Sequence, residues 1–477
     1  MIRAWAAPAR RARSAAGVAV LLAAVLALPF LAPAAAHADQ WRDKQYWLTD
    51  YGFKEAWKVS QGEGVKVAVI DTGIDSGHPD LTGAVVGGTD VSGAGDPSGV
   101  RGLGTNPEHG TLVATLLAGR GHAAPAPSPS ATDSKDGTGS KEDGDKPADT
   151  ADGSGVGTEG IVGVAPKAEL LAVSAWIGGT NPAGIPIDDQ IPAAIRWSVD
   201  NGAKVINMSL GSTSTSWPQS WDEAFLYAEE HDVVIVAAAG NRGVGMVQVG
   251  APATIPGVLT VAGLDRAGQA SWDSSSEGIS IGVAAPAENL VGGMPAGPAR
   301  YADWNGTSGA APLVAGTAAL IRSAYPEMSA AQVINRIIST ARDAGTPGQD
   351  TLYGYGVLDA NAALTAQVPV VAANPLGSIA DWIRIHRRGE APAPPVDAPV
   401  AVEPSLPPIP EPQVPVAVPA AAGGDALPAV LVLGFGGLLL AVLGAGTYSV
   451  LRARRPGSGS PAAEGAETGV REPSKPS

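Results

Sequence analysis

Short apolar runs alternate with segments of helical periodicity between residues 41 and 365, and this alternation leaves few possible folds. The apolar runs are 65–70, 169–174, 204–210, 233–239, 258–263 and 279–284, and the helical segments are 188–201, 217–230, 307–325 and 329–341. Strands that are apolar on both faces and separated by helices form parallel sheets covered on both sides. The sequence therefore predicts an α/β, doubly wound fold with a mainly parallel sheet.

The composition excludes several classes of function. Asp and Glu outnumber Lys and Arg by 46 to 31, which gives a net charge of −15. A nucleic-acid-binding protein normally has a basic surface, so we expect no nucleic-acid partner. The chain has no cysteine, which rules out a disulfide framework and a cysteine nucleophile.

The amino-terminal segment 1–38 is typical of a signal peptide. Four arginines precede an apolar run over 15–36, and the run ends in Ala36-His37-Ala38, a small-x-small cleavage pattern. An uncleaved amino-terminal anchor is the alternative. Both interpretations direct the chain to export.

A second apolar segment, 426–451, predicts a transmembrane helix near the carboxyl end. It contains no charged residue, and its length exceeds what a hydrocarbon core about 30 Å thick requires. Arg452, Arg454 and Arg455 follow, so the positive-inside rule makes 452–477 a cytoplasmic tail. A buried helix of a soluble domain is the alternative. We expect a single-pass protein of the plasma membrane with its main domain extracytoplasmic.

Two low-complexity stretches separate the folded part from its surroundings. Residues 391–420 contain eleven prolines, so we expect 366–425 to form a proline-rich stalk. Residues 122–160 are rich in Ser, Gly and Asp, with eight acids and three lysines, and we expect a disordered insertion there.

Three glycine-containing motifs place reactive side chains in the predicted sheet domain. Asp71 ends the first apolar strand, His109 opens a helix of small and apolar residues, and Ser308 lies at a turn before another such helix. Each residue alone could be a helix cap or a turn residue. Together they occur in the order Asp, His, Ser, which is the order of a known catalytic triad.

These motifs resemble those of the subtilisin-like serine proteases over about residues 45–365. Further similarity lies in 205–211, 233–241 and 353–360. The resemblance implies peptide hydrolysis without a cofactor: Ser308 is the nucleophile, His109 the general base, Asp71 its orienting acid, and Asn241 an oxyanion-hole donor. It also implies that a protein or peptide substrate binds along the backbone of Ser209, Leu210, Gly211, Ala238, Ala239 and Gly240. We find no sequence pattern of a calcium-binding loop and expect no metal ligand.

The layout of the chain resembles one branch of this family, the mycosins, which are membrane-anchored subtilases of type VII secretion systems. The short extension 39–64 is too small to fold alone, and its aromatic residues are expected to pack on the peptidase domain 65–365. Two features depart from the pattern: the chain has no cysteine, and Gly309 follows the nucleophile where a bulkier residue is usual. Gly309 either loosens the start of the helix or opens the pocket. A structural partner of a secretion complex and a general tethered protease are the alternative functions.

Overall fold

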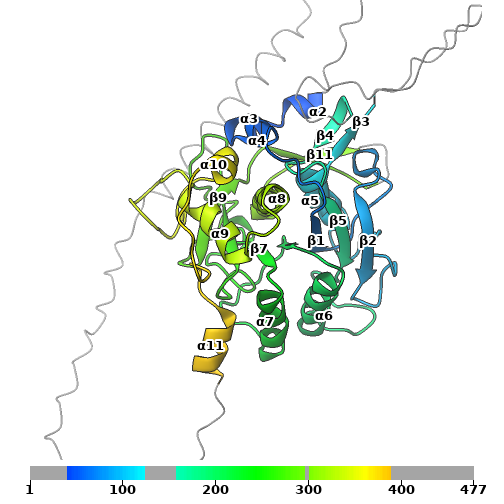
Figure 1. Ribbon diagram of the computed structural model, residues 1–477. Coiled ribbons are helices and arrows are strands. Elements are labelled where there is room, and N and C mark those ends of the chain that lie inside the picture. Colours follow the sequence, from blue (N-terminus) through cyan, green and yellow to red (C-terminus); the bar gives the residue numbers. More distant parts are fainter. Residues whose placement is uncertain (1–39, 124–156, 296–299, 388–477) are drawn as a thin grey trace, which may run out of the picture. The chain divides into compact units, whose positions relative to one another are not determined.

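The computed structural model describes residues 40–123, 157–295 and 300–387 (Figure 1). The predicted signal peptide, most of the insertion, the proline-rich stretch, the span 426–451 and the tail 452–477 lie outside these residues. Within the described ranges, no helix is long and apolar enough to cross a membrane.

A seven-stranded sheet forms the centre of the domain, in the order β2-β5-β1-β6-β7-β8-β9, and every neighbouring pair is parallel. The strands are β1 (Lys66–Asp71), β2 (Val85–Asp90), β5 (Glu169–Ser174), β6 (Val205–Met208), β7 (Val234–Ala238), β8 (Leu259–Leu264) and β9 (Ile281–Pro286). Six of them coincide with the predicted apolar runs within two residues. The predicted α/β fold with a mainly parallel sheet is thereby confirmed.

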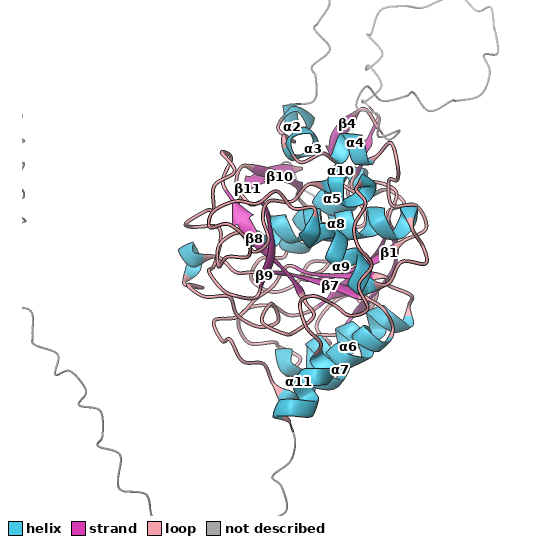
Figure 2. Ribbon diagram, turned by 60° about the vertical axis from the view of Figure 1, so that its left-hand side comes forward, coloured by secondary structure: helices cyan, strands magenta, loops and turns pink. Residues whose placement is uncertain are grey.

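Helices cover both faces of the sheet, and Figure 2 shows α6, α7 and α11 on one side and α5 and α8 on the other. The main helices are α5 (His109–Ala118), α6 (Ile187–Asp200), α7 (Asp222–Glu230), α8 (Thr307–Ala324) and α9 (Ala330–Ser339). The central helix α8 contacts β6, β7, β8 and β9 and also packs on α5. The many small residues of α8, chiefly Ala and Gly, permit this close approach, and almost all of the helix is buried.

Smaller elements complete the domain. They are α2 (Gln40–Asp43), α3 (Trp47–Asp50), α4 (Phe53–Ala56), η2 (Pro79–Leu81), η3 (Gln219–Trp221), η4 (Arg242–Val244), α10 (Ala360–Thr365), α11 (Ile379–His386), and the antiparallel pairs β3 (Arg120–His122) with β4 (Glu159–Val162) and β10 (Leu290–Gly293) with β11 (Tyr301–Trp304).

The expected limits of the insertion, 122–160, are corrected by the β3–β4 pair. His122 pairs with Glu159 in the ladder, and its Nδ1 lies 2.6 Å from Oδ1 of the buried Asp80. Asp80 also accepts a hydrogen bond of 2.7 Å from the backbone of Ile161. The two ends of the stretch are therefore ordered parts of the domain, because they share one buried carboxylate.

The extension before β1 contributes aromatic side chains to the core. Trp47 and Phe53 are fully buried, and α4 packs against α10 (Figure 1). The indole of Trp57 donates a 2.8 Å hydrogen bond to the carbonyl of Val164. Gln45 exchanges two hydrogen bonds with the backbone of Val162. These contacts join the extension to segments more than a hundred residues away.

The carboxyl-terminal limit of the folded domain also differs from the expectation, because residues 366–387 belong to it and not to a stalk. Helix α11 packs on α7, and the ring centroids of Trp382 in α11 and of Trp217, which precedes α7, lie 4.5 Å apart. Arg387 donates a 2.7 Å hydrogen bond from Nε to Oδ2 of Asp222. The proline-rich segment 391–420, which suggested a stalk, begins only after the residues that make these contacts.

We predict that Phe53→Ala lowers the free energy of unfolding by about 3–5 kcal/mol, because it leaves a cavity in the core. The matched change Val59→Ala, at a side chain that is 46% exposed, should alter it by less than about 0.5 kcal/mol. Urea unfolding followed by tryptophan fluorescence measures both, in the Ser308→Ala background to prevent self-digestion. Equal effects of the two changes would contradict the packing of the extension.

Candidate active site

The predicted site residues gather at one edge of the sheet because three adjacent parallel strands end there. Asp71 is the last residue of β1, Ser209 follows β6, and Gly240 and Asn241 follow β7. In open α/β sheets, ligands bind at the carboxyl ends of the strands. The strand order therefore brings together residues that lie up to 170 positions apart in the sequence.

Asp71 and His109 form the firmest contact of the site. The carboxylate of Asp71 is fully buried, and its Oδ1 lies 2.7 Å from Nδ1 of His109. The same oxygen accepts a 2.7 Å hydrogen bond from the backbone N–H of Thr72. Thr72 Oγ1 in turn accepts one of 3.1 Å from the N–H of Gly110. Two hydrogen bonds therefore join the end of β1 to the start of α5: the one between Asp71 and His109, and the one between Thr72 and Gly110.

Close approach of these two segments depends on a glycine. A Cβ atom on Gly110 would overlap the backbone carbonyl of Gly73, in the loop after β1. Any side chain at residue 110 would push α5 away from that loop. The histidine at the head of the helix would then lose its distance to Asp71.

The protonation of His109 is set by two opposing effects. Burial lowers the pKa of the imidazole. The charge of Asp71 and its hydrogen bond raise the pKa by more than burial lowers it, so the pKa of His109 lies above its ordinary value. Because Nδ1 faces Asp71, Nε2 is the nitrogen left to exchange a proton. The side chain remains 23% exposed, which leaves it open to a substrate.

Ser308 and Asn241 are held together at the head of α8. The backbone N–H of Thr307 donates a 2.8 Å hydrogen bond to Oδ1 of Asn241, and Thr307 Oγ1 donates one of 3.0 Å to the same oxygen. With the amide oxygen occupied in this way, Nδ2 of Asn241 is left for a ligand. Ser308 Oγ lies 3.2 Å from the carbonyl oxygen of Ser209 and donates to it.

A cavity of about 180 Å³ joins these groups. Its lining includes eight of the predicted site residues: His109, Ser209, Leu210, Gly211, Ala238, Gly240, Asn241 and Ser308. Asp71 lies behind His109 and does not line the cavity. Ala239 is a correction, because it does not line the cavity; its backbone N–H donates to Val261 in the sheet.

The structure adds seven lining residues that the sequence did not indicate: Thr72, Thr105, Asn106, Ile177, Gly178, Met246 and Thr307. Thr72 and Thr307 directly neighbour predicted residues, and this adjacency was the only signal for them. A second cavity of about 440 Å³ shares Ile177, Gly178, Leu210 and Gly211 with the first. The two cavities form one elongated binding region.

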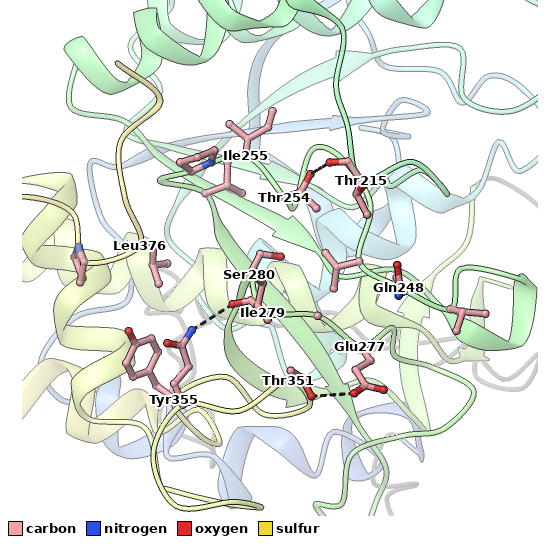
Figure 3. A pocket seen from close by; sticks show the side chains of 17 residues that line it. Thr215, Gln248, Thr254, Ile255, Glu277, Ile279, Ser280, Thr351, Tyr355 and Leu376 are labelled. Atoms are coloured by element: carbon pink, nitrogen blue, oxygen red, sulfur yellow. Dashed lines mark hydrogen bonds between the residues drawn. The ribbon is translucent and has the colours of Figure 1, made fainter. Parts of the chain in front are cut away.

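A larger cavity lies elsewhere among the described residues and carries no comparable chemistry. It measures about 800 Å³ and is lined largely by apolar groups, including Ile255, Ile279 and Leu376 (Figure 3). Some of the polar groups drawn there are hydrogen-bonded within the lining, as in the 2.9 Å bond from Thr351 Oγ1 to Glu277 Oε1. The residue chemistry therefore selects the smaller cavity as the site.

The arrangement can activate a hydroxyl group and stabilise an oxyanion. A buried acid fixes one nitrogen of an imidazole, the other nitrogen is free, and a serine and an amide donor line the same cavity. Among the described residues, no group of three or more His, Asp or Glu side chains is arranged to hold a metal ion.

Comparison with known proteins agrees with this chemistry. Residues 62–356 match the Subtilase family. Fervidolysin of Fervidobacterium pennivorans is 33% identical over 344 residues, covering 66% of this chain but only 43% of fervidolysin. Mycosin-3 of Mycobacterium tuberculosis is 34% identical over 402 residues, covering 72% of this chain and 74% of that protein.

Among solved structures, MycP1 from the ESX-1 type VII secretion system is similar, with a TM-score of 0.53 and 30% sequence identity. The match covers 72% of this chain and 91% of the MycP1 chain. The family match spans more than half of the sequence and includes every residue of the site. The chain therefore belongs to the subtilase family of serine endopeptidases, and within it is similar to the mycosins.

Proposed function

We propose that this chain is a membrane-anchored, extracytoplasmic serine endopeptidase that uses Asp71, His109 and Ser308 as its catalytic triad. The observation that carries the proposal is the 2.7 Å contact between His109 Nδ1 and Asp71 Oδ1, made beside a cavity that His109 and Ser308 both line. Its other nitrogen, Nε2, is then the base available to a hydroxyl group.

In the proposed mechanism, Ser308 Oγ attacks the carbonyl carbon of the peptide bond while His109 Nε2 takes its proton. Asp71 stabilises the imidazolium that forms. Nδ2 of Asn241 and the backbone N–H of Ser308 hydrogen-bond the oxyanion of the tetrahedral intermediate. His109 then gives its proton to the departing amine, and a water molecule activated by His109 releases the acyl group.

The substrate is proposed to bind as an extended peptide between the segment Ser209–Gly211 and the cavity-lining residues Ala238 and Gly240. Backbone pairing of this kind tolerates many sequences, so the side-chain pockets supply the preference. The wall of the smaller cavity is mainly apolar, with Leu210, Ala238 and Met246. We therefore propose that a small or medium apolar side chain precedes the cleaved bond.

The location is proposed from the sequence outside the described residues. The signal peptide 1–38 and the span 426–451 agree on one topology, with the protease at the outer face of the plasma membrane. Similarity to Mycosin-3 and to MycP1 of a type VII secretion system supports a role beside such an apparatus. The proposed substrates are proteins exported through it.

Asn241→Ala should lower kcat roughly 10²- to 10³-fold, the loss known for the corresponding donor in subtilisin. KM should change little, because the donor acts on charge that develops in the transition state. The matched control Asn201→Ala, at an exposed residue after α6, should leave kcat unchanged. Steady-state kinetics on a chromogenic peptide measures both, and an unchanged kcat for Asn241→Ala would place the oxyanion donor elsewhere.

Ser308→Ala should abolish both peptide cleavage and labelling by a fluorophosphonate probe, because this chain has no cysteine to substitute as nucleophile. Gel fluorescence after labelling of the full-length protein measures the effect. The matched change Ser216→Ala, at an exposed loop residue, should retain labelling. Labelling that persists in Ser308→Ala would refute the assignment of the nucleophile.

The same variant separates catalysis from a structural role in secretion. Deletion of the protein should stop export through the neighbouring apparatus, and Ser308→Ala should restore export without substrate processing. Export that fails equally in both strains, at normal protein levels, would show that catalysis alone carries the function. Normal export in the deletion strain would leave a tethered subtilase with another target.

A further inference from the structure

Gly309, the residue after the proposed nucleophile, is fully enclosed. A Cβ atom at this position would overlap Cδ1 of Leu290 and lie 3.3 Å from Cζ2 of the Trp304 ring. Gly309 does not line the catalytic cavity. The glycine therefore does not open the pocket, because Leu290 and Trp304 fill the volume that a larger side chain would take.

Leu290 and Trp304 are brought to this place by one hairpin. They face each other across the antiparallel pair β10–β11, and Leu290 is fully buried. Gly292, two residues along β10, also makes room for the indole: a Cβ there would lie 3.0 Å from Trp304 Nε1 and 2.8 Å from Leu112 of α5. The indole is partly buried and packs against β10, the head of α8 and the helix that carries His109.

Trp304 reaches His109 from this position. The two ring centroids are 5.9 Å apart and the planes meet at 80°, an edge-to-face arrangement. Trp304 Nε1 is buried and has no hydrogen-bond partner among the described residues. The indole is therefore held by packing alone. Its position depends on Leu290, which occupies the space beside Gly309.

We propose that Trp304 is a positioning residue for His109, and that Gly309 and Leu290 hold it in place. The hydrogen bond that Nδ1 of His109 donates to Asp71 fixes one nitrogen of the imidazole but still allows the ring to tilt about that contact. The indole restricts this movement and keeps Nε2 directed at the cavity. The inference rests on the proposed role of His109 as general base.

The role is distinguishable from direct contact with substrate. Trp304 does not line the catalytic cavity, so its removal should act on the chemical step and not on peptide binding. A small alkyl fluorophosphonate tests this, because its leaving group is fluoride and it makes none of the contacts of a departing peptide. Its reaction with Ser308 still requires His109 to accept the proton.

Trp304→Leu should lower both kcat for a peptide and the rate of fluorophosphonate labelling about 3- to 10-fold, with KM within about twofold of the wild type. Trp304→Phe, which retains an aromatic edge, should recover most of the rate. Trp272→Leu is the matched control, since Trp272 is 74% exposed and lines no part of the catalytic cavity; both rates should stay unchanged. Equal rates for Trp304→Leu and the wild type would overturn the proposal, as would a change in KM alone.

A second pair of variants tests the space beside Gly309. Gly309→Met should slow labelling because it displaces Leu290 and the indole, and the double variant Gly309→Met/Leu290→Ala should recover at least half of the loss. Absence of recovery would show that Leu290 is not the link. The Trp304 variants leave α8 untouched, so they decide the proposal even where Gly309→Met does not fold.

The variant His109→Ala separates the role of His109 as general base from the positioning role of Trp304. If His109→Ala labels as fast as the wild type, the proposed function itself fails. If His109→Ala loses labelling while Trp304→Leu retains it fully, only the positioning role fails.

Discussion

The hydrogen bond between Asp71 and His109 is the contact on which the rest of the site depends. Burial of the Asp71 carboxylate costs hydration, and the hydrogen bonds from Thr72 and His109 offset this cost at Oδ1 only, because Oδ2 has no partner among the described residues. The bond also joins the end of β1 to the start of α5. Gly110 and the order of the strands together keep the end of β1 close enough to the start of α5 for this bond to form.

Two helix heads meet at this edge of the sheet, and each carries one reactive group. Helix α5 presents His109, and α8 presents Ser308 together with Thr307, whose two hydrogen bonds orient Asn241. The hairpin β10–β11 lies against both helices, so Trp304 reaches the imidazole while Leu290 fills the space beside Gly309. Nucleophile, base and amide donor are therefore positioned by one packed unit.

Much of this arrangement could be predicted from the sequence, because it depends on local patterns. Buried parallel strands are continuous apolar runs, and the triad residues stand in glycine-rich motifs. Strand β2 was missed because its Gly87-Gly88 pair and half-exposed surface give no apolar run. His122, Trp304 and the segment 366–387 were missed because their partners are distant in sequence: Asp80, His109 and α7. Ala239 was misplaced because a motif does not tell which residue of a strand end turns into the sheet.

The most direct test of the account is a proton NMR titration of His109 in the Ser308→Ala protein, with and without Asp71→Asn. We predict that His109 titrates above the ordinary pKa of 6.5 when Asp71 is present. Its pKa should fall when the charge of Asp71 is removed, because burial is then opposed mainly by the weaker effect of Glu108. An identical titration in the two proteins would contradict the account, since it would mean that Asp71 does not control the protonation of the base.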